Sequence, residues 1–282
     1  MTNYNLNGKV IAITGSTGGL GRAAALALIA KGARLALLDL HQDAVNAQAQ
    51  GLGDKRQAAG WAADVRSMES VENALAQAAA HFGGIDIVIA NAGVGTNSSL
   101  SAMDPKEFDR TIDINLNGVM RTFRAALPHV ARRNGYLLAI SSMAAFVHSP
   151  LNTHYAASKA GVWAMCNSLR LEVKHLGVGV GSFHPTFFKT PMMDALVDNP
   201  CSMLVWNNHQ GIWKFAELEE VVGSLIYTLE NRRDMVTVPR QNAFIAGASG
   251  FLRPFIEKIG FDRKRVMKAV QLSEATAAKI KG

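Results

Sequence analysis

The sequence predicts an α/β protein with a Rossmann-type, doubly wound parallel sheet of seven strands and helices on both faces. Short apolar runs of strand length alternate with longer helical patterns along most of the 282 residues. The first apolar run, residues 10–14, leads directly into a glycine-rich turn and then a helix. A second run follows at 34–39, so the first β-α-β unit has the size of about thirty residues that is typical of a mononucleotide-binding half.

Strands are expected where short apolar runs are bounded by turn residues. In chain order they are 10–14, 34–39, 58–63, 85–90, 136–140, 178–183 and 235–238. Helices are expected at 20–31, where an Ala/Leu-rich segment ends near Gly32, and at 67–82, 105–132, 153–176 and 218–230. Strands joined by helices indicate a parallel sheet that is covered on both faces. Residues 186–216 lack a clear period, which is typical of a substrate lid.

The composition predicts a globular protein, because 49% of the residues are hydrophobic and 18% are charged. We expect one nucleotide-binding domain over residues 1–250, including the lid at 186–216, followed by a basic amphipathic extension over 251–282. Cys166 and Cys201 lack any metal or redox spacing, so no metal site is expected. No segment before Lys9 resembles a signal peptide and no apolar run has the length of a membrane span, which favours a cytoplasmic location.

Most of the net charge of +7 lies in the extension, where eight basic residues face three acidic ones. Apolar side chains are interleaved with them, namely Phe251, Leu252, Phe255, Ile256, Ile259, Phe261, Val266, Met267 and Val270. Two interpretations stay open: the apolar residues cap the domain while the charges face water, or the segment makes a peripheral contact with an anionic membrane. Nucleic-acid binding is not expected, because the basic residues accompany no recognisable binding module.

The glycine-rich turn Thr14-Gly15-Ser16-Thr17-Gly18-Gly19-Leu20-Gly21 predicts a nucleotide site. Gly15, Gly19 and Gly21 let the backbone turn tightly and approach a pyrophosphate, whose charge then meets the N–H groups at the start of the helix. Because the turn lies between a strand and a helix, nucleotide binding is a better explanation of the pattern than an ordinary glycine-rich turn.

Asp39, eighteen residues after Gly21 at the end of the second strand, indicates which nucleotide is bound. A carboxylate there accepts hydrogen bonds from the adenosine ribose hydroxyls and repels a 2′-phosphate. The sequence therefore favours NAD, with NADP as the alternative because His41 and Arg22 lie close in sequence. A structural role for Asp39, capping the next helix, also stays open.

Ser142, Tyr155 and Lys159 stand as Ser-x12-Tyr-x3-Lys just after the strand at 136–140. In a helix Tyr155 and Lys159 lie one turn apart on one face, where the ammonium favours the ionised phenol. The Ser142 hydroxyl can hydrogen-bond a substrate oxygen. Hydride transfer to or from a nicotinamide needs such an acid/base and such a donor, so we expect an alcohol dehydrogenase or carbonyl reductase. An ordinary surface pair on a helix is the alternative for Tyr155 and Lys159.

With these residues in place, the chain resembles the short-chain dehydrogenase/reductase family over roughly residues 7–240. Thr14-Gly15-x3-Gly19-x-Gly21 is similar to the family's cofactor turn, Asp64-Val65 to its adenine-binding pair, and Asn91-Ala92-Gly93 to its turn beside the nucleotide. The resemblance implies a set of cofactor contacts: Gly15, Ser16, Thr17, Gly19, Leu20, Gly21, Asp39, Asp64, Val65, Asn91, Ala92, Gly93, Tyr155, Lys159, Pro185 and Thr190.

The resemblance also implies a catalytic tetrad of Asn115, Ser142, Tyr155 and Lys159, since Asn115 lies forty residues before Tyr155 as the family's asparagine does. In that scheme Tyr155 is the acid/base and Ser142 holds the substrate oxygen. Lys159 binds the nicotinamide ribose and lowers the tyrosine pKa, and Asn115 holds a water that links Lys159 to solvent.

The chain departs from the family pattern after the strand at 178–183, where Pro185 is followed by Thr186 instead of the usual glycine. A side chain there narrows the nicotinamide end or changes how the lid leaves the sheet. Thr190 stands at the offset of the family's threonine that touches the nicotinamide amide, so it is the expected contact.

The lid suits an apolar, bulky alcohol or ketone, because it carries Phe187, Phe188, Met192, Met193, Leu196, Met203, Leu204, Trp206, Ile212 and Trp213. Packing within the lid is the alternative role for about half of these residues. His148 and His154 flank the tyrosine segment and are expected as solvated loop residues, with pocket lining as the alternative.

The resemblance implies a homodimer through the helices that contain Asn115 and Tyr155. A tetramer is the less favoured alternative, because the extension occupies the surface that the family uses for it. Two other functions stay open: a reductase of 3-oxoacyl groups on a carrier protein, and a nucleotide-sensing scaffold without turnover.

Overall fold

The computed structural model describes residues 4–190, 193 and 199–281 and contains one sheet of seven parallel strands. The strands follow the order β3-β2-β1-β4-β5-β6-β7. Their bounds are β1 Val10–Thr14, β2 Arg34–Asp39, β3 Ala58–Ala62, β4 Ile87–Ala90, β5 Tyr136–Ile140, β6 Gly179–Pro185 and β7 Met235–Val238. The predicted fold class is therefore confirmed, with the reversal of strand order between β1 and β4.

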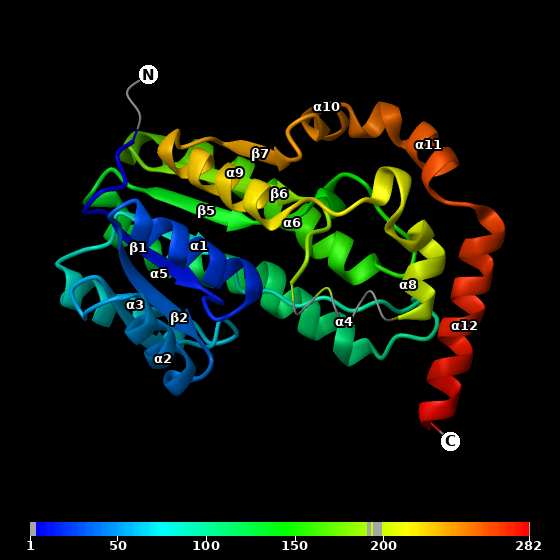
Figure 1. Ribbon diagram of the computed structural model, residues 1–282, viewed down its shortest axis with the longest axis horizontal. Helices are drawn as coiled ribbons and strands as arrows, with labels where there is room; N and C mark the ends of the chain where they lie inside the picture. The colour runs from blue at the N-terminus through cyan, green and yellow to red at the C-terminus, as the bar shows by residue number, and fades with distance from the viewer. Residues whose placement is uncertain (1–3, 191–192, 194–198, 282) are drawn as a thin grey trace.

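Helices cover both faces of the sheet (Figure 1). Their bounds are α1 Gly19–Ala30, α2 Gln42–Leu52, α3 Met68–Phe82, α4 Pro105–Ile112, α5 Gly118–Ala131, α6 Thr153–Glu172, α8 Pro200–Val205, α9 Leu218–Glu230, α10 Asn242–Gly247, α11 Ser249–Gly260 and α12 Arg263–Lys281. One apolar core joins the sheet to α3, α5 and α6, and a second core on the opposite face joins it to α1 and α9. Strand side chains alternate between the two cores, which is why all of β1 is buried.

The prediction of one continuous helix over 105–132 is wrong, because a π-helical turn, Asp113–Asn117, interrupts it. The turn separates α4 from α5 and carries Asn115 into the interior, where its side chain is fully buried. A Cβ at Gly118 would lie 2.9 Å from Cγ2 of Val65, so α5 can begin this close to the β3–α3 loop only with glycine. π-helical turns of this kind occur frequently at functional sites.

Several other boundaries differ from expectation. β4 begins at Ile87 rather than at residue 85, because the carboxylate of Asp86 accepts hydrogen bonds from the Val10 N–H and the Lys9 ammonium. β6 continues to Pro185. The segment 186–216 contains α8 and two 3₁₀ turns, Asn207–His209 and Gly211–Trp213, so it is more regular than its sequence indicated.

After β7 the chain forms α10, α11 and α12, which continue around one end of the molecule (Figure 1), and the extension expected over 251–282 begins within α11. α12 packs beside α8, and Ala269 of α12 is fully buried against Trp206 and its neighbours. In the middle of α12, Ser273 Oγ accepts a 3.0 Å hydrogen bond from the Ser99 N–H. Ala269 and Val270 of α12 therefore pack against the domain, as one of the two interpretations expects, whereas Met267 of the same helix is 56% exposed. No helix among residues 4–190 and 199–281 is long and apolar enough to cross a bilayer.

Candidate active site

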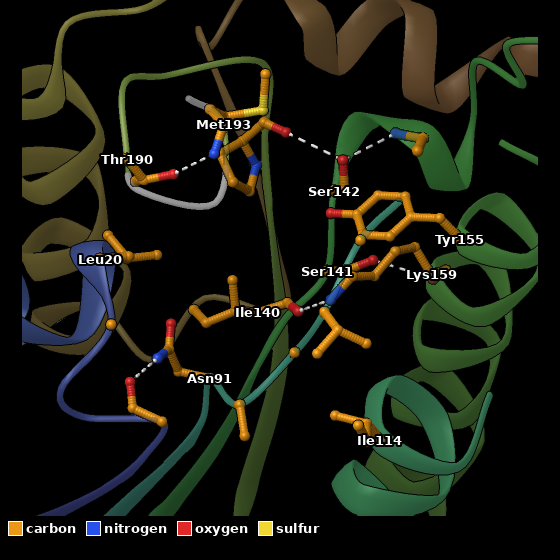
Figure 2. Close-up of a pocket in the computed structure, with 18 of the residues that line it drawn as sticks. Leu20, Asn91, Ile114, Ile140, Ser141, Ser142, Tyr155, Lys159, Thr190 and Met193 are labelled. Atoms are coloured by element: carbon orange, nitrogen blue, oxygen red, sulfur yellow. Dashed lines mark hydrogen bonds between the residues drawn. The ribbon is translucent and has the colours of Figure 1, made fainter. Parts of the chain in front are cut away.

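A cavity of about 570 Å³ lies across the carboxyl ends of the strands. It starts at the turn between β1 and α1 and extends to the aromatic side chains of the lid. Figure 2 shows side chains from α1, the end of β4, the end of β5 and α6 around the same space. The cavity thus occupies the point where strand order reverses, which is where open α/β sheets bind their ligands.

The glycine turn forms the end of this cavity at which a nucleotide is expected, here called the nucleotide end, with Gly15, Thr17, Gly18, Gly19 and Leu20 in its wall. Gly15 has a φ of +63°, and a Cβ there would lie 2.7 Å from the Cα of Ala92, so glycine is required on both counts. The N-cap residue of α1, Gly18, gives no side-chain hydrogen bond to the first helical turn. The N–H groups of that turn are therefore available to an anion such as a pyrophosphate.

Two neighbouring elements hold the turn in place. Asn91, at the end of β4, donates through Nδ2 to the carbonyl of Gly15 at 2.8 Å and to that of Thr14 at 3.1 Å. Ser16 is fully buried, and its hydroxyl bonds Gln48 Oε1 of α2 at 3.0 Å. Ser16 and Gly21, both expected as cofactor contacts, do not line the cavity, while Asn91 does.

Asp39 lies at the cavity wall and is tied to the glycine turn. Its Oδ2 accepts hydrogen bonds from Thr17 Oγ1 at 2.7 Å and from the Thr17 N–H at 3.0 Å. Its Oδ1 accepts a bond from the Leu40 N–H. The N-cap of α2 is His41, so Asp39 does not cap that helix and is held at the end of β2 facing the nucleotide end.

The expected adenine end is formed by Asp64 and Val65, which both line the cavity. Arg66, a lining residue that sequence reasoning missed, forms an ion pair of 2.7 Å with Asp64. The hydrogen bond from Arg66 holds the pKa of the Asp64 carboxyl below its usual value. Ala92 and Gly93, after β4, also line the cavity, as does Ile114, whose position next to Asn115 was its only sequence signal.

Tyr155 and Lys159 extend from one face of α6 into the cavity (Figure 2). Nζ of Lys159 lies 5.4 Å from the centre of the Tyr155 ring. The same ammonium donates a 2.9 Å hydrogen bond to the carbonyl of Ile140 at the end of β5. Tyr155 and Lys159 are therefore not an ordinary surface pair, because Lys159 is only 4% exposed beside the phenol.

Burial shifts the pKa values of Tyr155 and Lys159 so that the neutral form of each side chain is favoured. It raises the pKa of Tyr155 above its ordinary value, and the hydrogen bond with the Ser142 side chain lowers that pKa by a smaller amount. Burial also lowers the pKa of Lys159 to about 8. Burial of the phenol thus outweighs the effect of Ser142, and ionisation of Tyr155 near neutral pH needs additional stabilisation by positive charge.

Ser142 lies where β5 ends, beside Tyr155 (Figure 2). Its hydroxyl accepts a 3.1 Å hydrogen bond from the Ala144 N–H and lies 3.5 Å from the carbonyl of Pro185. Its own carbonyl lies 3.2 Å from Nδ1 of His184, which must carry the proton because a carbonyl can only accept. His184, a residue that sequence reasoning missed, is fully buried and fixes the backbone of Ser142 against β6.

Asn115 does not line the cavity and instead fixes the loop after β4. Its Oδ1 accepts a 2.8 Å bond from the Val94 N–H, and its Nδ2 donates to the Val94 carbonyl at 2.9 Å and to Ser158 Oγ at 3.2 Å. A Cβ at Gly93 would lie 3.3 Å from Asn115 Oδ1 and 3.7 Å from Lys159 Nζ, so the amide and the ammonium approach one point. The tetrad residues are therefore brought together, with Asn115 behind the cavity wall.

The lid side of the cavity mixes aromatic and polar residues. Five predicted lid residues line it, namely Phe187, Phe188, Met193, Trp206 and Trp213, together with Pro185, Thr186 and Thr190. Met203 and Ile212 are exposed, and Leu204 packs beneath α12. Met192 and Leu196 lie outside the described residues. The described lid residues thus divide between lining, packing and exposure, and packing accounts for Leu204.

Thr190 lies at the cavity wall (Figure 2), where its Oγ1 accepts a hydrogen bond from the Met193 N–H. His148 is exposed, as expected, but His154 is fully buried. Nε2 of His154 bonds Thr96 Oγ1 at 2.9 Å, and Thr96 lines the cavity. The expectation of a solvated loop is therefore wrong for His154, because the first turn of α6 is packed against the loop after β4.

Comparison with known proteins bears on this geometry. The family described as short chain dehydrogenase matches residues 9–200 of the sequence. The chain belongs to the short-chain dehydrogenase/reductase family. It is thus an oxidoreductase of that family, and the family implies a nicotinamide cofactor. The glycine turn fits such a cofactor. The N–H groups of the first turn of α1 are free, and the absence of a Cβ at Gly15 lets the backbone approach the loop after β4 closely.

Individual short-chain dehydrogenases/reductases resemble the chain over most of its length. A 3-oxoacyl-acyl-carrier-protein reductase of Thermotoga maritima is 28% identical over 236 residues, which cover 82% of this chain and 94% of that protein. An uncharacterized NAD-dependent oxidoreductase of Mycobacterium tuberculosis is 32% identical over 206 residues, covering 67% and 75%. The crystal structure of a short-chain type dehydrogenase/reductase from Mycobacterium marinum has a TM-score of 0.75 at 27% identity, covering 83% of this chain and 95% of the other.

Proposed function

We propose that this protein interconverts an apolar secondary alcohol and its ketone with NAD as cofactor and Tyr155 as the acid/base. One observation carries the proposal: a continuous cavity connects the glycine turn and Asp39 with Ser142, Tyr155 and Lys159, and then with the aromatic lid. A nucleotide and a small apolar molecule can therefore meet beside the phenol.

The position of Asp39 supports NAD over NADP. Its carboxylate lies at the cavity wall, and both of its oxygens are directed by bonds from the Thr17 and Leu40 backbone. A 2′-phosphate at that place would meet a fixed negative charge. The name of the Mycobacterium tuberculosis relative, an NAD-dependent oxidoreductase, agrees with this choice.

In the direction of oxidation, the Ser142 hydroxyl orients the alcohol oxygen and Tyr155 removes its proton as the ketone forms. The nicotinamide, when bound, supplies the hydride acceptor and a positive charge. The buried ammonium of Lys159 stabilises the tyrosinate, and the proton passes from the alcohol oxygen to the phenolate oxygen. In reduction the neutral phenol donates the proton to the ketone oxygen, which suits the raised pKa of Tyr155.

The lid favours an apolar substrate, because Phe187, Trp206 and Trp213 line the cavity opposite the catalytic groups. The Phe187 and Trp206 rings lie 4.8 Å apart, which provides an aromatic wall. A carrier-linked 3-oxoacyl substrate is a second candidate, favoured by the Thermotoga maritima relative. Activity towards a 3-oxoacyl thioester that exceeds activity towards cyclic and aliphatic secondary alcohols would select this second candidate.

The central experiment measures binding of NADH and NADPH by calorimetry, and then turnover with a panel of steroid, retinoid and aliphatic alcohols. Tyr155→Phe is expected to leave NADH affinity within about twofold and to lower kcat by about 10²–10⁴-fold, the contribution of a positioned acid/base. Tighter binding of NADPH would contradict our interpretation of Asp39. Nucleotide binding without turnover of any panel member, in wild type as in Tyr155→Phe, would support a nucleotide-sensing scaffold instead.

We also propose a homodimer formed through α4, α5 and α6. Met120 of α5 and Leu171 of α6 are large apolar side chains with exposures of 41% and 66%. Light scattering of the purified protein is expected to give twice the chain mass, and Leu171→Asp is expected to shift it to the monomer. A tetramer in the wild type would mean that the extension leaves a second interface open.

A further inference from the structure

α11 presents an apolar face that nothing in the described parts of the chain covers. Phe251, Phe255 and Ile259 are exposed to 87%, 62% and 52%. They are spaced four residues apart, so they lie along one side of the helix. Phe244 of α10, exposed to 72%, adds a fourth apolar side chain. Figure 1 shows α10 and α11 at an outer corner of the molecule, beyond the end of β7.

The fold does not need this face for its own packing. α11 is attached through its last turn, where Gly260 is buried. A Cβ at Gly260 would lie 2.8 Å from Cζ2 of Trp213, and Trp213 Nε1 donates a 3.2 Å hydrogen bond to the Gly260 carbonyl. The Phe261 ring also lies 5.1 Å from Trp213. The end of α11 is thus anchored to the lid while its three exposed large apolar residues remain in contact with solvent.

Basic residues lie on the same helix as the apolar face and directly after it in the chain. Lys258 lies beside it on α11, and Arg263 and Lys264 open the first turn of α12; all three are exposed. None of the ion pairs formed within residues 4–190 and 199–281 involves them, and Arg253 of α11 reaches Glu257 only at 3.6 Å. Exposed apolar side chains next to unpaired cations are typical of helices that lie in the interface of an anionic bilayer.

We propose that Phe244, Phe251, Phe255 and Ile259, here called the docking face, insert into an anionic lipid surface with Lys258, Arg263 and Lys264 against its phosphates. Charge selects this occupant over a second copy of the chain. Two copies joined through the docking face would bring six unpaired cations together, whereas an anionic bilayer neutralises them and accepts the apolar side chains. The proposal does not depend on the substrate or on turnover.

The test is sedimentation of the full chain with vesicles of phosphatidylcholine alone and of phosphatidylcholine mixed with phosphatidylglycerol. Wild type is expected to bind the anionic vesicles and to bind the neutral ones at least about tenfold more weakly. The double variant Phe251→Asp/Phe255→Asp is expected to lose about tenfold or more in affinity for the anionic vesicles. Lys258→Glu/Lys264→Glu is expected to weaken binding as well, as is added salt.

Leu26→Asp provides a matched control, because Leu26 of α1 is exposed to the same 62% as Phe255 but lies on a different helix. It is expected to bind vesicles as wild type does. Thermal unfolding and NADH binding show that each variant is folded. Failure of wild type to bind anionic vesicles would overturn the proposal, as would undiminished binding by the Phe251/Phe255 double variant. A loss of oligomer mass in that variant, with no lipid binding by wild type, would assign the face to a second copy instead.

Discussion

Lys159 carries its charge inside the protein, with 4% of the residue exposed and the Ile140 carbonyl as a hydrogen-bond acceptor. Burial lowers its pKa from 10.5 to about 8. A lysine whose pKa is lower in the folded than in the unfolded chain costs stability while it is charged. The cost is fully present below pH 8 and disappears as the pH rises to about 10.5, where both states are neutral.

Lys159→Met is therefore expected to be more stable than wild type at neutral pH. The pKa difference corresponds to about 3 kcal/mol, from which about 1 kcal/mol is subtracted for the lost hydrogen bond. The gain of about 2 kcal/mol below pH 8 should shrink as the pH rises towards 10.5, while turnover is lost at every pH. Urea unfolding of both proteins at pH 7 and pH 10 measures it. A variant that is less stable than wild type at pH 7 would show that the charged group is compensated by contacts we have not identified.

At the residue scale, the sequence was informative where function depends on short spacings. Tyr155 and Lys159 were predictable because an i,i+4 pair lies on one helix face wherever the helix packs. His184 was not, because its role depends on the pairing of β5 with β6, which places Ser142 beside it. The buried side chain of Ser16 was likewise hidden, since only α2, which the sequence did not delimit, supplies Gln48.

Among the elements, the glycine turn is held by backbone contacts too close for any side chain. A Cβ at Gly21 would lie 2.7 Å from the carbonyl oxygen of Ser16 and 2.8 Å from its Cα. Because these atoms belong to the backbone of the turn, a side chain at residue 21 would displace either α1 or the segment that we propose binds the nucleotide.

Gly21→Ala is expected to weaken NADH binding by about tenfold or more and to destabilise the fold by about 1–3 kcal/mol, as overpacking does. Gly51→Ala is the matched control, because Gly51 lies within α2 and a Cβ there meets nothing within 4 Å. That variant should gain about 0.5–1 kcal/mol from helix propensity and bind NADH as wild type does. Calorimetry and thermal unfolding measure both. Equal NADH affinity of the two variants would show that the turn adapts.

Element boundaries were predictable where burial is uniform and unpredictable where tertiary contacts decide. β1, β2, β5 and β7 match their apolar runs because both faces of the sheet are covered. The π-helical turn at 113–117 interrupts a segment whose period is otherwise helical, and only its contacts with Val94 and Ser158 explain the interruption. α8 and α12 stabilise each other, so neither is evident from its own sequence.

At the scale of the whole molecule, α12 connects two walls of the cavity. It packs on α8 and Trp206 through Ala269, and its Ser273 and Glu274 bond Ser99 and Ser101 of the loop after β4. Asn97 of that loop bonds Ser202 of α8 in turn. The lid and the loop are therefore held by one helix from the far end of the sequence.

Ala269→Asp is expected to detach α12, because it places a carboxylate in a fully buried position. The loss of stability should be about 3 kcal/mol, and KM for the substrate should rise while NADH affinity is kept, because the nucleotide end lies elsewhere. Ala275→Asp, on the exposed side of the same helix, is the control and should behave as wild type. Unfolding curves, tryptophan fluorescence and steady-state kinetics are the measurements. An unchanged KM for Ala269→Asp would mean that α12 does not shape the substrate end.

The packing of α12 on α8 and on the loop after β4 has a consequence for the newly made chain. Trp206 and Val205 emerge from the ribosome well before Ala269, which completes the apolar cluster that covers them. At a synthesis rate of about 5–20 residues per second, this apolar surface stays uncovered for on the order of several seconds. During that interval the first six strands of the sheet are already made. The nascent protein is therefore most prone to aggregate through the uncovered surface at the substrate end, and we expect chaperones to bind there.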